Sequence, residues 1–430
     1  MAQHLLDKRD SIVKNFLSLG LLQGANAIIP LLAIPFIVRA LGVEMFGKVT
    51  FAQSVVQYFT IIINYGFDYS ATKAVAVSVN DGRKVDNVFW GVISAKFSLF
   101  VISSALFFLL SIGYGRIEED LLLYVALFAI NIGYVFFPSW FFQGIEDMQY
   151  VAILNFIIKL VGMGLPVLLV TVPDDYMIYA AMPSVACSVM GIVGFLFAIR
   201  HYDIERPSAE AIREERNAQL KNGFPIFLNT LFAALYTVAN VTILGLFKDD
   251  YDVGIYSGAY KIICAIMMVT SMPLHTAIFP SIARKMDESS RTGWIYYKRM
   301  TVYVFLFGLA VSLCTYLAAP LMVEILLGEE FLAGIPLLRL LSVIPALVII
   351  ASMFTVQGLY GLGFTKYAPC VGLAVGLACI ALNLVWIPQL GGTGAAYAWI
   401  VAQVLEILIS GGIVIWNVRR LTNKIDGWEK

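Results

Sequence analysis

The stretch Val88-Phe-Trp-Gly-Val-Ile-Ser-Ala-Lys-Phe-Ser-Leu-Phe-Val-Ile-Ser-Ser-Ala-Leu-Phe-Phe-Leu-Leu-Ser-Ile112 is apolar throughout, apart from Lys96 and a few serines. A helix needs about 20 such residues to cross a hydrocarbon core roughly 30 Å thick. Strands of a membrane β-barrel are only about ten residues long, and they alternate between apolar and polar side chains. The stretch therefore predicts a membrane-spanning α-helix.

Similar runs recur along the whole chain of 430 residues, of which 60% are hydrophobic and 13% charged. Ordinary soluble domains carry about 25% charged residues, so the excess of apolar side chains must face lipid. We therefore expect an all-α polytopic membrane protein with about 12 transmembrane helices. The predicted spans are 15–38, 49–68, 88–112, 121–143, 150–172, 177–199, 223–247, 253–280, 300–326, 335–361, 367–387 and 393–417.

The residue types that usually carry soluble chemistry are scarce or scattered. The formal net charge is zero, which gives no reason to expect nucleic acid as a partner. The three histidines are far apart, and the five cysteines lie in apolar runs without paired spacing, so we expect no metal site. The glycine-rich segments 358–363 and 391–394 lack the context of nucleotide-binding loops. We therefore expect no cofactor and no enzyme activity.

The positions of Lys and Arg predict the orientation in the membrane. With the N-terminus inside, cytoplasmic segments hold 21 of these residues and the opposite side holds four. Because Lys and Arg accumulate in cytoplasmic loops, both termini are predicted to be cytoplasmic.

The chain is predicted to form two six-helix lobes of the same orientation. The N-terminal lobe would cover 1–199 and the C-terminal lobe 223–430, joined by a charged cytoplasmic linker at 200–222. Repeats of this parallel type are known in transporters. A shift of 207 residues supports the repeat, because it aligns Lys14-Asn15 with Lys221-Asn222, Gly47 with Gly254, and Ala52 with Ala259.

Polar side chains recur on one face of the second predicted span. Their spacing of three or four residues is that of a single helical face, and the set comprises Gln53, Gln57, Thr60, Asn64 and Asp68. Span one adds Gln23 and Asn26. Two interpretations stay open: the face lines an aqueous cavity, or its members form interhelical hydrogen bonds, each worth about 0.6 kcal/mol.

Basic side chains outnumber acidic ones within the predicted spans. The basic candidates are Lys96, Lys159, Lys261 and Arg339, with Arg39 near a span end, and the acidic candidates are Glu406 and, near a span end, Asp68. A cavity with surplus positive charge suits an anionic cargo such as a phosphate or pyrophosphate. Residues near span ends could instead extend to the membrane surface.

Lys261 lies about nine residues into its span, where escape to the surface is difficult. The small residues on its face favour a cargo site, because they leave room beside the ammonium group. A buried ion pair with Glu406 is the alternative explanation. The small residues are Gly254, Ser257, Gly258 and Ala265.

Five segments carry a family resemblance: Pro30–Gly42 running on to Phe46-Gly47, Tyr65–Lys73, Pro138–Glu146, Gly328–Phe331 and Gly394–Ala396. They resemble the O-antigen flippases, the polysaccharide-transporter branch of the multidrug/oligosaccharidyl-lipid/polysaccharide (MOP) flippase superfamily. The resemblance implies a MATE-like pair of bundles around a central polar cavity that opens alternately to either side. It also implies a cargo of undecaprenyl-pyrophosphate-linked oligosaccharide, moved across the bacterial inner membrane. Membrane lipid and other polysaccharide-assembly membrane proteins are the further partners it allows.

The segment Tyr256–Lys261, followed by Pro280–Ala283, is similar to one in lipid-II flippases that carries a cavity-lining basic residue. That similarity implies the same role for Lys261. The chain departs from those proteins in span one, where Gln23 and Asn26 stand in place of a charged cluster. Their two additional C-terminal spans also have no counterpart here.

Together these arguments give one set of candidate site residues. We expect ion-coupled transport, with Asp68 and Glu406 as candidates for ion coupling, because no ATP site is recognisable. A MATE-type exporter of small organic molecules and a membrane polysaccharide polymerase are the alternatives; the first would need buried carboxylates and the second a large outer loop. The substrate-binding candidates are Lys261, Lys159, Arg339, Arg39, Lys73, Lys96, Asn26, Gln57 and Asn64.

Overall fold

A computed structural model describes residues 12–288, 290–360 and 364–426, and every regular element within these ranges is helical. The chain divides into two compact units. Unit 1 comprises Met1–Met45 and Ala52–Thr230, and unit 2 comprises Phe46–Phe51 and Leu231–Lys430. The long helix α12 therefore begins in unit 1 and ends in unit 2.

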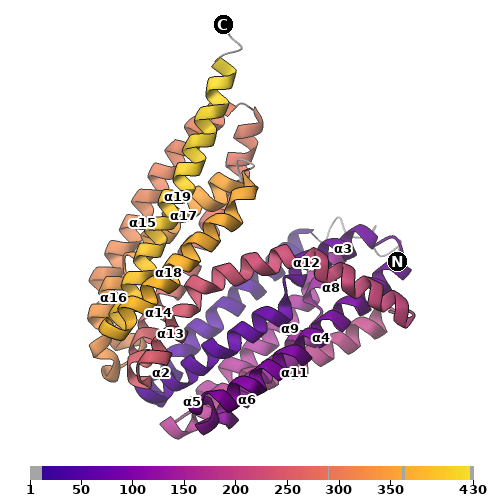
Figure 1. Cartoon of the computed structure of the whole chain (residues 1–430), viewed down its shortest axis with the longest axis horizontal. Helices are drawn as coiled ribbons and strands as arrows, with labels where there is room; N and C mark the ends of the chain where they lie inside the picture. The colour runs from indigo at the N-terminus through magenta and orange to yellow at the C-terminus, as the bar shows by residue number, and fades with distance from the viewer. Residues whose placement is uncertain (1–11, 289, 361–363, 427–430) are drawn as a thin grey trace. The chain divides into compact units, whose positions relative to one another are not determined.

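In unit 1, α3 packs against both α4 and α8, and α9 packs against both α8 and α11 (Figure 1). Its elements are α2 (Ile12–Asn64), α3 (Phe67–Ser78), α4 (Gly82–Gly113), α5 (Gly115–Glu119), α6 (Leu121–Phe128), α7 (Ile130–Phe136), α8 (Ser139–Gly144), α9 (Met148–Lys159), the π-helix η2 (Leu160–Gly164), α10 (Pro166–Leu169), the short 3₁₀ turn η3 (Pro173–Asp175), α11 (Tyr176–His201) and the first part of α12 (Ala209–Thr237).

In unit 2, α19 packs against both α17 and α18, and α15 packs against α14 and α17. Its elements are α13 (Ala239–Phe247), α14 (Asp250–Glu288), α15 (Ser290–Leu326), η4 (Glu329–Gly334), α16 (Ile335–Leu341), α17 (Ile344–Ser352), the π-helix η5 (Met353–Tyr360), η6 (Thr365–Tyr367), α18 (Ala368–Leu390) and α19 (Gly392–Asp426).

The described residues contain nine helical segments long and apolar enough to cross a membrane, or ten if a bent pair within 209–247 forms one span. These ten correspond to predicted spans three to twelve. Large apolar side chains on their surfaces are exposed, such as Phe108, Leu109 and Ile112 on α4. Such a surface is expected where lipid covers the protein, and the chain is a multi-pass membrane protein.

The first predicted span and most of the second fall within the single helix α2 rather than in two helices joined by a loop. The last residues of the second span lie beyond the end of α2, and its residues 67 and 68 open α3. The helix is interrupted at Gly42, whose φ of 71° and ψ of 177° are not helical. A positive φ favours glycine because other residues carry a Cβ that clashes there. The sequence predicted a loop at 39–48, and the structure has a sharp local break instead.

Two further interruptions occur within spans and bring polar groups to one place. Phe137 has an extended backbone between α7 and α8, directly before Pro138. The π-helix η2 separates α9 from α10, directly before Leu165 and Pro166. Because proline has no N–H and its ring clashes with the carbonyl four residues earlier, both interruptions follow from the sequence.

Aromatic rings dominate the core of unit 1. Phe89 on α4 packs against Phe141 and Trp140, with ring centroids 5.3 and 5.7 Å apart, and all three side chains are buried. Edge-on and tilted ring pairs of this kind contribute stability beyond that from the burial of their apolar surface. This core fixes α8 against α4 and so fixes the break at Pro138.

Candidate functional site

Unit 1 contains a cavity of about 620 Å³ whose walls come from α3, α4, α7, α8, α9 and α11, together with the end of α2. We call it the lysine cavity. Five candidate residues predicted from the sequence line it, namely Asn64, Asp68, Lys73, Lys96 and Lys159. Polar groups beside them come from Tyr134, Ser139 and Asn155.

Lys96 is the most deeply buried of the three lysines, with 2% of its surface exposed. Its Nζ donates a hydrogen bond to the Tyr134 carbonyl oxygen at 3.0 Å and lies 3.4 Å from Asn64 Oδ1. In an unbroken helix, the N–H of residue 138 would occupy that carbonyl. Pro138 has no N–H, so the break after α7 supplies the acceptor that holds the Lys96 ammonium group.

Asp68 lies in the first turn of α3, where Gly66 adopts a φ of 81° and separates this helix from α2. The Ser139 hydroxyl, at the start of α8, donates to Asp68 Oδ1 at 3.0 Å. One turn further along α3, the Thr72 hydroxyl donates to the Trp140 carbonyl oxygen at 3.1 Å. The two bonds hold α3 and α8 together and place the carboxylate at the cavity wall.

Lys159 is the last residue of α9, and the wider π-helical turn begins directly after it. The turn is closed by a bond of 2.9 Å from the Leu165 N–H to the Leu160 carbonyl oxygen. Single π-helical turns are frequent at functional sites. Lys159 is half-buried, and Asn155 lies one turn before it on the same cavity wall.

The described lining of the lysine cavity carries three ammonium groups and one carboxylate. Positive charge is therefore in surplus, and the surrounding amides and hydroxyls can donate or accept hydrogen bonds. Within walls of low dielectric constant, such a surplus attracts anions strongly. The arrangement can hold a phosphate or diphosphate group, for which lysine is a suitable point charge.

Other polar residues of the predicted stripe lie elsewhere in unit 1. Gln57 is exposed on α2 and is not part of the lysine cavity. Thr60 is buried, and its hydroxyl donates to Asn131 Oδ1 at 2.8 Å, so for Thr60 the interhelical interpretation is the right one. Arg39 is exposed on α2. The side chain of Asn26 lies outside the described residues.

In unit 2, the Lys261 Nζ lies 4.4 Å from the centroid of the Phe46 ring, a cation–π contact. Free space was expected beside Lys261 on the helical face that carries Gly258, and the structure has none at Gly258. A Cβ added to Gly258 would lie 2.9 Å from Leu327 Cδ1 and 3.1 Å from Phe331. Leu327 and Phe331 therefore fill the space beside Gly258, and the expectation of free space was wrong at this position.

The remaining two candidates in unit 2 also contact neighbouring side chains. The Arg339 guanidinium lies 5.4 Å from the centroid of the Tyr316 ring. The Glu406 side chain lies close to that of Gln403, one turn earlier on α19. Neither contact tests whether Arg339 binds substrate or whether Glu406 couples ions, so both roles stay predictions.

The sequence interpretation missed the Tyr134 carbonyl and Ser139. Backbone acceptors leave no trace in residue type, but Pro138 was a usable signal. A proline within an apolar run frees the carbonyl four residues before it, which here is that of Tyr134. Ser139 follows the same proline, and its bond to Asp68 depends on a helix packing that no local pattern shows.

Comparison with solved structures shows the class of fold. The lipid II flippase MurJ, in an inward closed conformation, matches with a TM-score of 0.72 at 13% identity, over 92% of this chain and 86% of that one. An inward-facing multidrug resistance MATE family transporter of the MOP superfamily matches with a TM-score of 0.67 at 17% identity, over 92% and 96%. The chain has the fold of MOP-superfamily transporters.

Comparison of sequences shows the family. The profile of the family described as polysaccharide biosynthesis protein matches residues 12–286, and the chain belongs to this family. A relative from Escherichia coli (strain K12), provisionally named O-antigen transporter, is 27% identical over 372 residues. The match covers 86% of this chain and 89% of the relative. The predicted resemblance to the polysaccharide branch of the superfamily is thereby confirmed.

Proposed function

We propose that this protein is a flippase that moves a polyprenyl-diphosphate-linked oligosaccharide, such as an O-antigen repeat unit, across the bacterial inner membrane. The observation that carries the proposal is the lysine cavity, in which Lys73, Lys96 and Lys159 face a single carboxylate, Asp68. A diphosphate carries the negative charge that this surplus attracts. The name of the Escherichia coli relative points to the same class of cargo.

In the proposed mechanism, the lysines hold the diphosphate while the polyprenyl tail stays in the lipid. Alternating access then exposes the head group to the other side of the membrane. Lys73 and Asp68 are exposed, whereas Lys96 is buried, so the cargo meets Lys73 before it reaches Lys96. The distribution of Lys and Arg predicts that this end of unit 1 faces the cytoplasm, which fits loading from the inner leaflet.

The energy source in this proposal is an ion gradient or the membrane potential. We assign coupling to the carboxylates of Asp68 and Glu406. The Ser139 hydroxyl donates to Asp68 Oδ1, and a coupling cation bound at Asp68 would compete with that bond. Coupling of this kind would alter the charge of the lysine cavity directly, because Asp68 is part of its wall.

A MATE-type exporter of small organic cations is the second candidate, and Asp68 is the observation in its favour. A cation would meet the three lysines of the same cavity, however, and like charges within a few ångströms repel. The charge of the cavity therefore favours the anionic cargo.

Deletion of the gene tests the proposed function. We expect lipid-linked oligosaccharide to accumulate on the cytoplasmic face of the membrane, and a plasmid copy to clear it. A copy with Lys159→Arg should clear most of it, and a copy with Lys159→Met should not, at equal membrane abundance. An unchanged lipid-linked oligosaccharide pool in the deletion strain would refute the proposal.

A further inference from the structure

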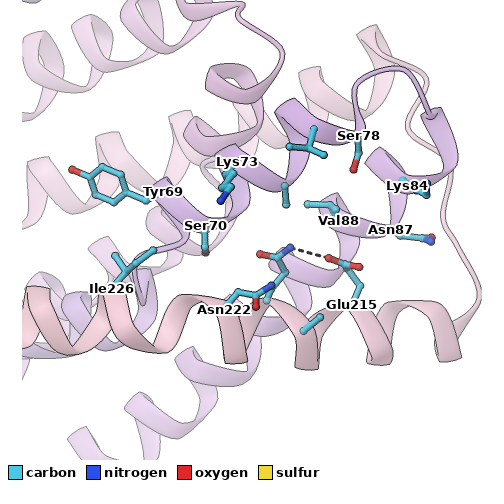
Figure 2. Close-up of a pocket in the computed structure, with 14 residues that line it drawn as sticks. Tyr69, Ser70, Lys73, Ser78, Lys84, Asn87, Val88, Glu215, Asn222 and Ile226 are labelled. Carbon is cyan, nitrogen blue, oxygen red and sulfur yellow. Dashed lines mark hydrogen bonds between the residues drawn. The ribbon is translucent and has the colours of Figure 1, made fainter. Parts of the chain in front are cut away.

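A second cavity of unit 1, of about 780 Å³, lies between α3, α4 and α12 (Figure 2). We call it the α12 cavity. Its volume falls within the range of roughly 300–1,000 Å³ that is typical of small-molecule sites. Tyr69 and Lys73 line both this cavity and the lysine cavity, so the two are neighbours along α3.

Close packing fixes α12 as the wall of this cavity. The Tyr65 ring stacks on Phe227, with centroids 4.7 Å apart. A Cβ added to Gly66 would lie 2.5 Å from Ile226 Cγ2, and one added to Gly223 would lie 3.1 Å from Tyr65 Cδ1. The chain segment before α3 and the helix α12 therefore approach each other closely at Gly66 and Gly223, and this packing fixes the shape of the cavity.

Two buried polar atoms at this cavity have no hydrogen-bond partner among the described residues. Gln219 is 2% exposed, and its Nε2 donates to Glu215 Oε1 at 2.8 Å, while its Oε1 is unsatisfied. The Ser70 hydroxyl is the second such atom. Unsatisfied buried groups cost about 1–3 kcal/mol each. A ligand that brings hydroxyl groups would satisfy both with a small side-chain rotation.

The remaining lining has the chemistry of a sugar site rather than that of a second phosphate site. Asn87 and Asn222 offer amides that both donate and accept hydrogen bonds. The Tyr69 ring is 73% exposed, and an aromatic face packs against the apolar face of a sugar ring. Lys84 already pairs with Asp81 at 3.2 Å, which leaves Lys73 as the cation shared with the lysine cavity.

We infer that the α12 cavity binds the glycan of the cargo while the adjoining lysine cavity binds its diphosphate. The inference rests on the proposed function, since it assigns a second part of the same cargo to a second cavity. Lys73 and Tyr69, which line both cavities, lie where the first sugar joins the diphosphate. The glycan is held by amide and hydroxyl groups on α3, α4 and α12.

Binding to the full-length protein in nanodiscs tests this assignment. The probes are lipid-linked oligosaccharide extracted from host membranes, undecaprenyl diphosphate without sugar, and the soluble oligosaccharide released from the lipid. The variants are Asn222→Ala and Ser70→Ala. The matched control is Asn217→Ala, on the same helix but outside the cavity lining.

We expect each cavity variant to weaken binding of the glycosylated lipid by roughly three- to ten-fold, the effect of one lost hydrogen bond. Binding of undecaprenyl diphosphate should not change, and the control should bind both lipids as the wild type does. Equal weakening of both lipids, or no weakening of either, would overturn the glycan assignment while leaving the proposed function intact. If the wild type binds neither lipid, the proposed function fails instead. The glycan assignment then stands only if the released oligosaccharide binds and loses that binding in Asn222→Ala.

Discussion

The Lys96 ammonium group donates to the Tyr134 carbonyl oxygen at 3.0 Å, in place of the N–H that Pro138 lacks. A buried lysine in a membrane protein usually needs an acceptor, because an unpaired charge in hydrocarbon is costly. Here the helix break provides that acceptor and also starts α8, which carries Ser139. One proline therefore organises both the basic and the acidic side of the lysine cavity.

The first prediction is that Lys96 and Pro138 are energetically coupled. Lys96→Met should lower the free energy of unfolding by about 1 kcal/mol, because it leaves the Tyr134 carbonyl without a donor. In a Pro138→Ala background the cost should be smaller, because residue 138 then supplies an N–H. Thermal denaturation in detergent of the wild type, both single variants and the double variant measures this coupling. Strict additivity would show that the bond does not contribute to stability.

The second prediction separates stability from transport at two lysines. Lys159→Met should leave the melting temperature within about 2 °C of the wild type. The side chain is only half-buried, and substitutions at partly exposed positions change the free energy of unfolding little. Lys159→Met should nevertheless reduce transport at least ten-fold, whereas Lys96→Met should reduce both. Melting temperature and transport are measured on the same preparations. A Lys159→Met protein that transports normally would remove this residue from the site.

The third prediction concerns water in the lysine cavity. Cysteine at Asn155, on the cavity wall, should react with a water-soluble thiol reagent, and added undecaprenyl diphosphate should slow the reaction. Cysteine at Ala152 on the same helix should not react, because that position is only 6% exposed. Native cysteines, including Cys187 of the cavity lining, are replaced beforehand. Equal labelling rates at positions 155 and 152 would contradict an aqueous cavity at position 155.

The fourth prediction concerns helix packing at Gly133. A Cβ at this position would lie 2.5 Å from the Cys187 backbone, so Gly133→Ala should destabilise the protein by about 1–3 kcal/mol. Gly113→Ala is the control, because no described heavy atom outside the local backbone lies within 4 Å of a Cβ there. Fluorescence-detected melting of the two variants gives the comparison. Identical melting temperatures would contradict the close approach of α7 and α11.

Hydropathy alone located ten of the predicted spans, because the requirement to cover a membrane thickness leaves a long and unambiguous signal. The break at Gly42 replaced a predicted loop, since a glycine in an apolar run does not show whether the chain turns or only kinks. For the lysine cavity, charged residues in apolar spans identified Lys96, Lys159 and Asp68, because such residues need a physical reason to be there. The same pattern also selected Gln57 and Arg39, which lie outside that cavity. Spacing along one helix cannot show which face meets which neighbour.

The most direct test of the central claim is translocation of fluorescently labelled lipid-linked oligosaccharide in proteoliposomes. Wild-type protein should move the labelled lipid to the opposite leaflet, Lys159→Arg should keep part of that rate, and Lys159→Met should fall to the rate of protein-free vesicles. Equal translocation by the wild type and a correctly folded Lys159→Met protein would contradict the assignment of the lysine cavity as the site that binds the diphosphate.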